Sequence, residues 1–321
     1  RLSLVGSEMC IRDRYNFGSA ILRAVGDTKR PLYYLSAAGV INIGLNLLFV
    51  IVFRMSVAGV ALATVISETI SASLVIRCMM KEKGSIRLTP SKLRIHPKRF
   101  AEILRIGLPA SLQGVIFAIS NVIIQSSVNS FGSTVVAGNS AASNIEGFVY
   151  VSMNSFYQGT ISFTSQNVGA GKYERVNKIL FTAQACVIVT GLVLGNLAVF
   201  FGPDLLGFYT RSAAVKAAGM NRLKIICTVY ALCGIMDVMV GSLRGLGYSV
   251  MPTIVSLIGA CGLRLLWIFT FFRIYEQFHT PQSLYLTYPV SWIITICAHV
   301  VCFVIVRRRI SRRLKTQSMA Q

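Results

Sequence analysis

Eight long apolar stretches constrain what this chain can fold into more than any other feature. Each is about as long as the roughly 20 residues that a helix needs to cross the hydrocarbon core of a bilayer. In chain order they are Leu32–Phe53, Val57–Ile76, Leu108–Phe131, Val135–Phe163, Phe181–Phe201, Ile225–Leu243, Thr253–Phe272 and Leu284–Val306. Only 13% of the 321 residues are charged, against about 25% in soluble domains. The sequence therefore predicts an all-α membrane protein with eight transmembrane helices.

Positively charged residues gather in every second connection between these stretches. Of the 32 Lys and Arg residues, 22 lie in one alternating set of connections, which includes the tail after residue 306. The opposite set holds six, at Arg54, Arg211, Lys216, Arg222, Lys224 and Arg273. Because short loops rich in Lys and Arg stay in the cytoplasm, the first set and the C-terminus are predicted to be cytoplasmic, in a multi-pass protein of a bacterial-type plasma membrane. The net charge of +21 thus indicates topology, with no nucleic-acid partner.

The parts outside the spans divide the chain. Residues 1–14, RLSLVGSEMCIRDR, look like the translation of a sequencing adaptor, which predicts that the natural chain continues upstream of Tyr15. Residues 15–76 are interpreted as the remainder of one bundle, beginning with the end of an earlier helix. Residues 77–106 are predicted to form a cytoplasmic linker that ends in an amphipathic helix, residues 107–306 a six-helix bundle, and residues 307–321 a basic cytoplasmic tail.

One short pattern occurs twice. Arg23, Gly26 and Pro31 follow the spacing R-x-x-G-x-x-x-x-P, and the same spacing recurs 221 residues later with Arg244 and Gly247. Each copy is predicted to end one helix in Gly and to start the next near Pro. The repetition indicates two related bundles, an arrangement found in secondary transporters.

These motifs resemble those of the multidrug and toxic compound extrusion (MATE) transporters. The resemblance rests on ILRAVGDT at Ile21–Thr28, SLRGLG at Ser242–Gly247, QNVGAGK at Gln166–Lys172 with Arg175, and GLPA at Gly107–Ala110. It implies a twelve-helix protein of two six-helix bundles, of which this chain carries the end of helix 4 and helices 5–12. It also implies export of amphiphilic, often cationic compounds in exchange for H⁺ or Na⁺, by a protein without other cofactors. A monomer is expected, with the bilayer and small substrates as its partners.

Ionisable residues within spans are costly and therefore mark candidate functional positions. Glu146 is the first candidate, because polar and aromatic residues share its helical face within about 80°. They are Asn139, Ser143, Tyr150, Asn154 and Tyr157. Such a stripe suits a cavity where Glu146 binds a cation or takes up a proton. A polar seam between helices is the alternative interpretation.

Asp237 and Arg264 give a second candidate position. Asp237 could join Glu146 in a site for the coupling ion, or it could form an ion pair with Arg264 on the next span. Asn121 and Gln125 follow i, i+4 spacing on the third span. The predicted substrate cavity consists of Asn121, Gln125, Ser143, Tyr150, Asn154 and Tyr157. Packing between helices is the alternative for the two amide residues.

The sequence has three other interpretations: a flippase, an enzyme and an inactive chain. A flippase for a lipid-linked saccharide would carry several cationic residues in its cavity, whereas Arg264 is the one Arg or Lys expected within a span. An enzyme is disfavoured because intramembrane ionisable groups are few and dispersed. The eight cysteines contain no CxxC pair and the three histidines are scattered, so no metal site is expected. Finally, a chain without helices 1–3 could be inactive.

Overall fold

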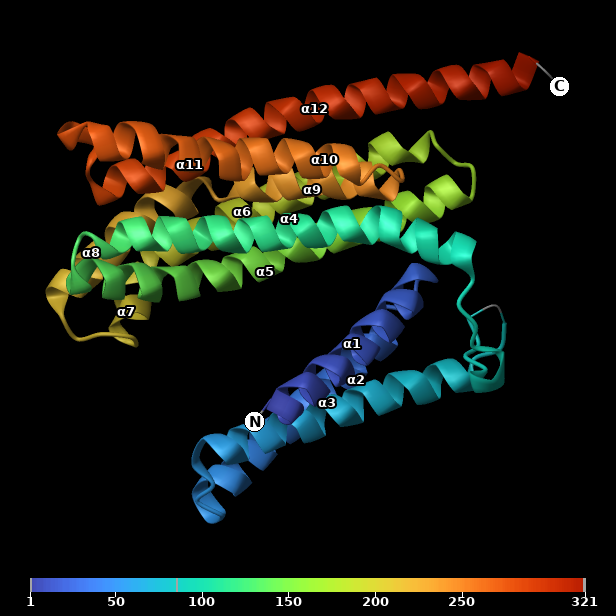
Figure 1. Ribbon diagram of the computed structural model, residues 1–321, viewed down its shortest axis with the longest axis horizontal. Helices are drawn as coiled ribbons and strands as arrows, with labels where there is room; N and C mark the ends of the chain where they lie inside the picture. The colour runs from blue at the N-terminus through green and yellow to red at the C-terminus, as the bar shows by residue number, and fades with distance from the viewer. Residues whose placement is uncertain (1, 85, 320–321) are drawn as a thin grey trace. The chain divides into compact units, whose positions relative to one another are not determined.

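The computed structural model describes the backbone of residues 2–84 and 86–319, and the side chains of residues 9–84 and 86–312. All regular secondary structure in these ranges is helical, without a β-strand. This confirms the predicted all-α class. The chain divides into two compact units, residues 1–95 and residues 96–321. Figure 1 shows their helices.

Unit 1 consists of three long helices in which α3 packs against both α1 and α2. Their bounds are α1 Leu2–Ala24, α2 Lys29–Leu47 with a π-helical extension η1 Leu48–Val52, and α3 Ser56–Lys81, followed by a short 3₁₀ turn η2 Pro90–Lys92. Leu22, Val75 and Met79 form the buried core. Residues 2–14 of the predicted leader are helical and continuous with the rest of α1.

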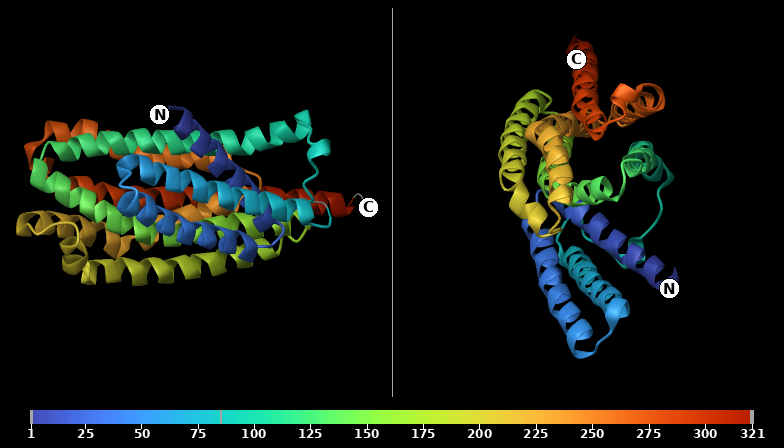
Figure 2. Two further views of the ribbon diagram at one scale, coloured as in Figure 1. Left: turned by 90° about the horizontal axis from the view of Figure 1, so that it is seen from below. Right: turned by 90° about the vertical axis from the view of Figure 1, so that its left-hand side faces the viewer.

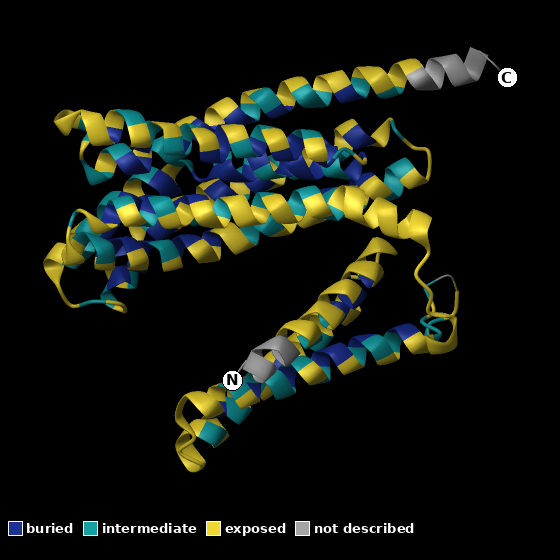
Figure 3. Ribbon diagram, viewed as in Figure 1, coloured by how far each residue is buried: buried dark blue, intermediate teal, exposed yellow. Residues whose placement is uncertain are grey.

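Unit 2 is a larger bundle whose long helices run alongside one another (Figures 1 and 2). The helices are α4 Pro97–Asn129, α5 Ser133–Gly169, α6 Arg175–Phe200, α7 Gly202–Gly207, α8 Ala213–Ile226, η3 Cys227–Val229, α9 Ala231–Gly245, α10 Val250–Ser256, η4 Leu257–Gly262, α11 Leu263–Trp267, η5 Ile268–Phe272, η6 Glu276–Phe278 and α12 Pro281–Met319. α5 packs against α6, α8 and α9, and α12 packs against α8 and α9. The buried residues are concentrated on α9, whereas α4 is exposed along most of its length (Figure 3).

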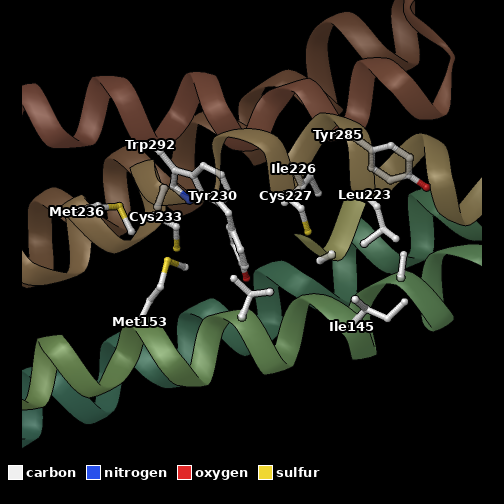
Figure 4. Packing of buried hydrophobic residues seen from close by; sticks show 14 of the residues in the cluster. Ile145, Met153, Leu223, Ile226, Cys227, Tyr230, Cys233, Met236, Tyr285 and Trp292 are labelled. Atoms are coloured by element: carbon white, nitrogen blue, oxygen red, sulfur yellow. The ribbon is translucent and has the colours of Figure 1, made fainter. Parts of the chain in front are cut away.

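The core of unit 2 forms where α5 faces α8, α9 and α12. Met153 points from α5 toward Cys233 of α9 (Figure 4). Tyr230 and Trp292 pack together, with ring centroids 5.6 Å apart. The opposite faces of these helices carry exposed apolar side chains such as Val301 of α12, which is 59% exposed. Apolar outer faces around a packed interior are what a lipid environment requires.

Helices occur at all eight predicted spans. Within the described residues, six helical segments are long and apolar enough to cross a bilayer, and the pair Ala213–Val229 and Ala231–Gly245, bent by 48°, would be a seventh. The 37-residue α5 falls outside that set because it carries many polar residues. One detail differs from the prediction. α4 starts at Pro97 and runs through Pro109, so the amphipathic helix expected at the end of the linker, residues 98–106, is part of the long helix and forms no separate one.

The repeated motif has the same local geometry in both copies. Gly26 and Gly247 have φ angles of +93° and +86°, a conformation that glycine adopts without strain. The residue after each glycine donates its N–H five residues back, from Asp27 to Leu22 O and from Tyr248 to Leu243 O, both at 3.0 Å. This hydrogen bond closes the helix end in a Schellman-type cap. The prediction that each copy ends a helix is confirmed.

Close approach of α5 and α8 depends on glycine. A Cβ at Gly138 of α5 would lie 2.7 Å from Val215 O and 2.8 Å from Gly219 N, both backbone atoms of α8. Small residues at such contacts let helices pack tightly in membranes. Because Gly138 has no side chain, the backbones of α5 and α8 can approach this closely.

We expect Gly138→Ala to destabilise unit 2 by about 1–3 kcal/mol, because the added methyl group overlaps the α8 backbone. Gly147→Ala is the matched control on the same helix, since a Cβ there has no neighbour within 4 Å. Thermal unfolding in detergent micelles measures both variants. Equal melting temperatures for the two would contradict the assigned contact.

Candidate functional site

Unit 2 contains a partly open cavity of about 420 Å³ lined by polar and aromatic side chains. Its polar, charged and aromatic lining includes Asn121, Glu146, Tyr150, Asn154, Tyr157, Asp237, Arg244, Arg264, Tyr288 and Trp292. They come from α4, α5, α9, α11 and α12. A larger groove of about 770 Å³ lies along α6, α9 and α12, but its walls are mostly apolar and carry no acidic residue among those described. The smaller cavity is therefore the candidate site, because it gathers the ionisable groups.

Glu146 is held in a buried, bidentate ion pair with Arg222 of α8. Arg222 donates from Nε to Oε1 and from Nη2 to Oε2 of Glu146, each at 2.7 Å. Its Nη1 donates to Oδ1 of Asn139 at 2.8 Å. The guanidinium also lies 5.4 Å from the ring centroid of Tyr285 and 5.5 Å from that of Tyr288. Both carboxylate oxygens are thus occupied and the charge of Glu146 is compensated.

The position of Arg222 differs from the prediction. The sequence pattern predicts Arg222 in a connection between spans, on the side opposite to the cytoplasm. In the structure Arg222 is 7% exposed and lies within α8. A signal for this was present: Gly219, Leu223 and Ile226 fall at i−3, i+1 and i+4 from it, and all three are buried. That periodicity indicates an inward face.

A series of hydrogen bonds between amide side chains runs from the Glu146–Arg222 pair to α4. Asn139 Nδ2 donates to Gln125 Oε1 at 2.9 Å, and Gln125 Nε2 donates to Asn129 Oδ1 at 3.1 Å. Ser143 turns back on its own helix, donating to the carbonyl of Asn139 at 2.8 Å. Gln125 and Ser143 therefore lie outside the cavity lining, whereas the other four predicted cavity residues, Asn121, Tyr150, Asn154 and Tyr157, line it.

Asp237 lines the cavity from α9 and makes no hydrogen bond or ion pair with any residue whose side chain the structure describes. The alternative pairing of Asp237 with Arg264 is not formed. Arg264 instead donates from Nε to Ser291 Oγ at 2.9 Å and lies 4.0 Å from the ring centroid of Tyr288. The candidate carboxylate that faces the cavity without a fixed partner is thus Asp237 rather than Glu146.

Arg244, the arginine of the second repeat, points into the bundle and joins four helices. It donates to the hydroxyl of Tyr157, to Gln113 Oε1 at 2.8 Å and to Thr253 Oγ1 at 3.3 Å. Its role in the motif therefore goes beyond ending α9: the side chain forms part of the cavity wall. The sequence pattern marked this position without showing where the side chain points.

No metal site accompanies these groups. Across the described residues, no three His, Cys, Asp or Glu side chains lie close enough to hold a metal ion.

The chain is similar in sequence to one protein family and to several bacterial proteins. The MatE family model matches residues 109–270, about half of the chain. The probable multidrug resistance protein YpnP of Bacillus subtilis is 30% identical over 286 residues, which cover 88% of this chain and 62% of the relative. The chain spans between 55% and 62% of the first three curated relatives.

Solved structures of transporters share the fold. The Vibrio cholerae MATE transporter VcmN in its bent form superposes with a TM-score of 0.82 at 19% identity, covering 94% of this chain and 68% of that protein. A MOP superfamily transporter from Pyrococcus furiosus gives a TM-score of 0.81 at 21% identity, with coverages of 92% and 66%. For that protein a binding pocket of reverse polarity is described as suggesting a different function.

We expect Glu146→Gln and Arg222→Gln each to destabilise the protein by about 3–5 kcal/mol, because each leaves a buried charge without its partner. The double variant should lose much less than the sum of the two. Unfolding in detergent, analysed as a double-mutant cycle, measures this coupling. The exposed pair Arg99–Glu102 of α4 is the control, and its coupling should stay below about 1 kcal/mol. Additive losses at Glu146 and Arg222 would contradict the assigned pair.

Proposed function

Because the chain belongs to the MATE family of transporters, we propose that the protein exports small amphiphilic compounds in exchange for H⁺ or Na⁺. The observation that carries this proposal is Asp237, a carboxylate on the wall of a cavity in the helical bundle that has no hydrogen-bond or ion-pair partner among the described side chains. An ionisable group at such a position is a site for a proton or a cation by default. The name of the relative YpnP, a probable multidrug resistance protein, supports transport of small molecules.

In this proposal Asp237 binds the coupling ion and Glu146 does not. Glu146 is already neutralised by Arg222 through two short hydrogen bonds. Loading H⁺ or Na⁺ onto Asp237 would remove the free negative charge from the cavity wall. This change in charge alters the relative stability of the inward-open and outward-open states. The shift equals the difference between the affinities of the two states for the ion. Alternating access then moves ion and substrate past the same midplane cavity.

Further parts of the proposal concern the setting of the protein. We place it in a plasma membrane with a cytoplasmic C-terminus, as the distribution of Lys and Arg indicates. We propose a monomer that needs no cofactor besides the coupling ion and that catalyses no chemical reaction.

A flippase for a lipid-linked saccharide is the second candidate, and one observation favours it. The sequence pattern counts against it, because Arg264 is the one Arg or Lys expected within a span. In the structure, however, both Arg244 and Arg264 line the cavity. Two cations on one cavity wall fit the phosphate groups of such a substrate.

We expect Asp237→Asn to abolish ion-driven efflux of a fluorescent dye from vesicles that contain the full-length natural protein, because the variant cannot gain or lose the charge that couples ion to substrate. Asp204→Asn is the matched control, since Asp204 is exposed on α7 outside the cavity. Dye fluorescence after imposing an H⁺ or Na⁺ gradient measures the rate. Undiminished efflux by Asp237→Asn would refute the proposed coupling site.

A further inference from the structure

Arg264 is a buried guanidinium whose charge is not balanced by a neighbouring acid. It is 5% exposed and lines the cavity, and it forms no ion pair with any residue in the described part of the chain. Its Nε bonds Ser291, while no described residue accepts a hydrogen bond from Nη1 or Nη2. Buried cations are normally paired. A guanidinium left in this state is suited to a negatively charged ligand.

We propose that the cavity of unit 2 binds the anionic group of a soluble, aromatic, amphiphilic substrate, such as a carboxylate, sulfonate or phosphate ester, with Arg264 as its principal anchor. The inference rests on the proposed transport function, because it names the substrate class of the same cavity. It does not depend on the direction in which the coupling ion moves.

The charge balance of the cavity supports an anion. Glu146 and Arg222 cancel one another through their bidentate pair. The groups that remain on the cavity wall are one acid, Asp237, and two arginines, Arg244 and Arg264. Their formal sum is +1, and it becomes +2 when Asp237 carries a proton. A cationic substrate would add to this excess within a bilayer, where charge repulsion is weakly screened, whereas an anion would compensate it.

The geometry around Arg264 holds its donors in place. Tyr288 covers one face of the guanidinium at 4.0 Å, and Trp292 lies 5.7 Å away. Ser291, on the same helix as both, fixes Nε. The two free terminal nitrogens then present the parallel donors that match two oxygens of a carboxylate or phosphate. Because the side chain is already ordered, binding costs less conformational entropy.

The cavity also has room and surface for an aromatic group. Its volume of about 420 Å³ falls within the range of small-molecule sites. Phe117, Tyr150 and Tyr230 line it along with Trp292. Aromatic walls stack with planar ligands at offset or edge-on angles. The combination favours a compound that has a fused ring and an acidic substituent.

The test uses two xanthene dyes of similar size and opposite charge, the anion fluorescein and the cation rhodamine 123. Fluorescence anisotropy measures their binding to the purified chain in phosphatidylcholine nanodiscs. We expect fluorescein to bind at least about 10-fold more tightly than rhodamine 123, and Arg264→Gln to weaken fluorescein binding by at least about 10-fold, because charge-assisted bidentate contacts are lost. Arg273→Gln, which removes an exposed arginine outside the cavity, should change neither dye.

Two further variants separate binding from folding. Arg264→Lys keeps the charge and should retain part of the fluorescein affinity even if Arg264→Gln fails to fold. Asp237→Asn removes the one free negative charge, so it should strengthen fluorescein binding and weaken rhodamine 123 binding. Size-exclusion chromatography and thermal unfolding confirm that each variant is folded.

Several results would overturn the proposal. These are tighter binding of rhodamine 123 to the unmodified chain, no binding of either dye, or equal fluorescein affinities for Arg264→Gln and Arg273→Gln. Loss of fluorescein binding when phosphatidylglycerol replaces phosphatidylcholine would assign the cavity to a lipid phosphate instead. Efflux of rhodamine 123 without fluorescein binding would refute the proposed anionic substrate class but not the proposed transport function. Fluorescein binding without ion-driven transport would refute the proposed transport function but not the anion site.

Discussion

The buried ion pair between Glu146 and Arg222 is the interaction on which the rest of the site depends. Neither charge could stay in an apolar bundle alone, since the desolvation of each is compensated only by the partner and by added hydrogen bonds. Asn139 supplies one of these bonds at 2.8 Å. The pair joins α5 to α8, and the contact at Gly138 keeps the two helices close enough for both 2.7 Å bonds to form. Packing and electrostatics therefore support the same helix interface.

α8 and α9 form one bent segment, and its two halves bring charged residues to different places in the bundle. The two segments, Ala213–Val229 and Ala231–Gly245, meet at an angle of 48°. On one side α8 carries Arg222 into the core, where its charge is cancelled. On the other side α9 carries Asp237 and Arg244 to the cavity, where no side chain in the described part of the chain bonds to Asp237. Since one acid is neutralised and the other is free, the character of the cavity follows from Asp237 and the two arginines on its wall.

The repeated Arg-Gly-Pro motif shows how one local pattern can serve two levels of structure. At the local level, Gly26 and Gly247 end their helices with the same left-handed conformation and the same five-residue hydrogen bond. At the tertiary level, Arg244 reaches across the bundle to Gln113 and Tyr157. The glycine explains why the helix ends there, and the side-chain contacts of Arg244 explain why an arginine precedes the glycine by three residues.

The sequence by itself determined the helical membrane class, the helical segments at the predicted spans and both helix ends at the repeated motif. The six substrate-cavity residues stay a prediction, and four of them line the cavity of unit 2. These features depend on local composition and periodicity, which reach over one or two helical turns. Only the tertiary structure decided that Glu146 pairs with Arg222, that Gln125 joins an amide network and that Asp237 is left free. Arg222 lies 76 residues beyond Glu146, and no spacing rule connects them. Their pairing is set by which faces of α5 and α8 meet, and that is a property of the packed bundle.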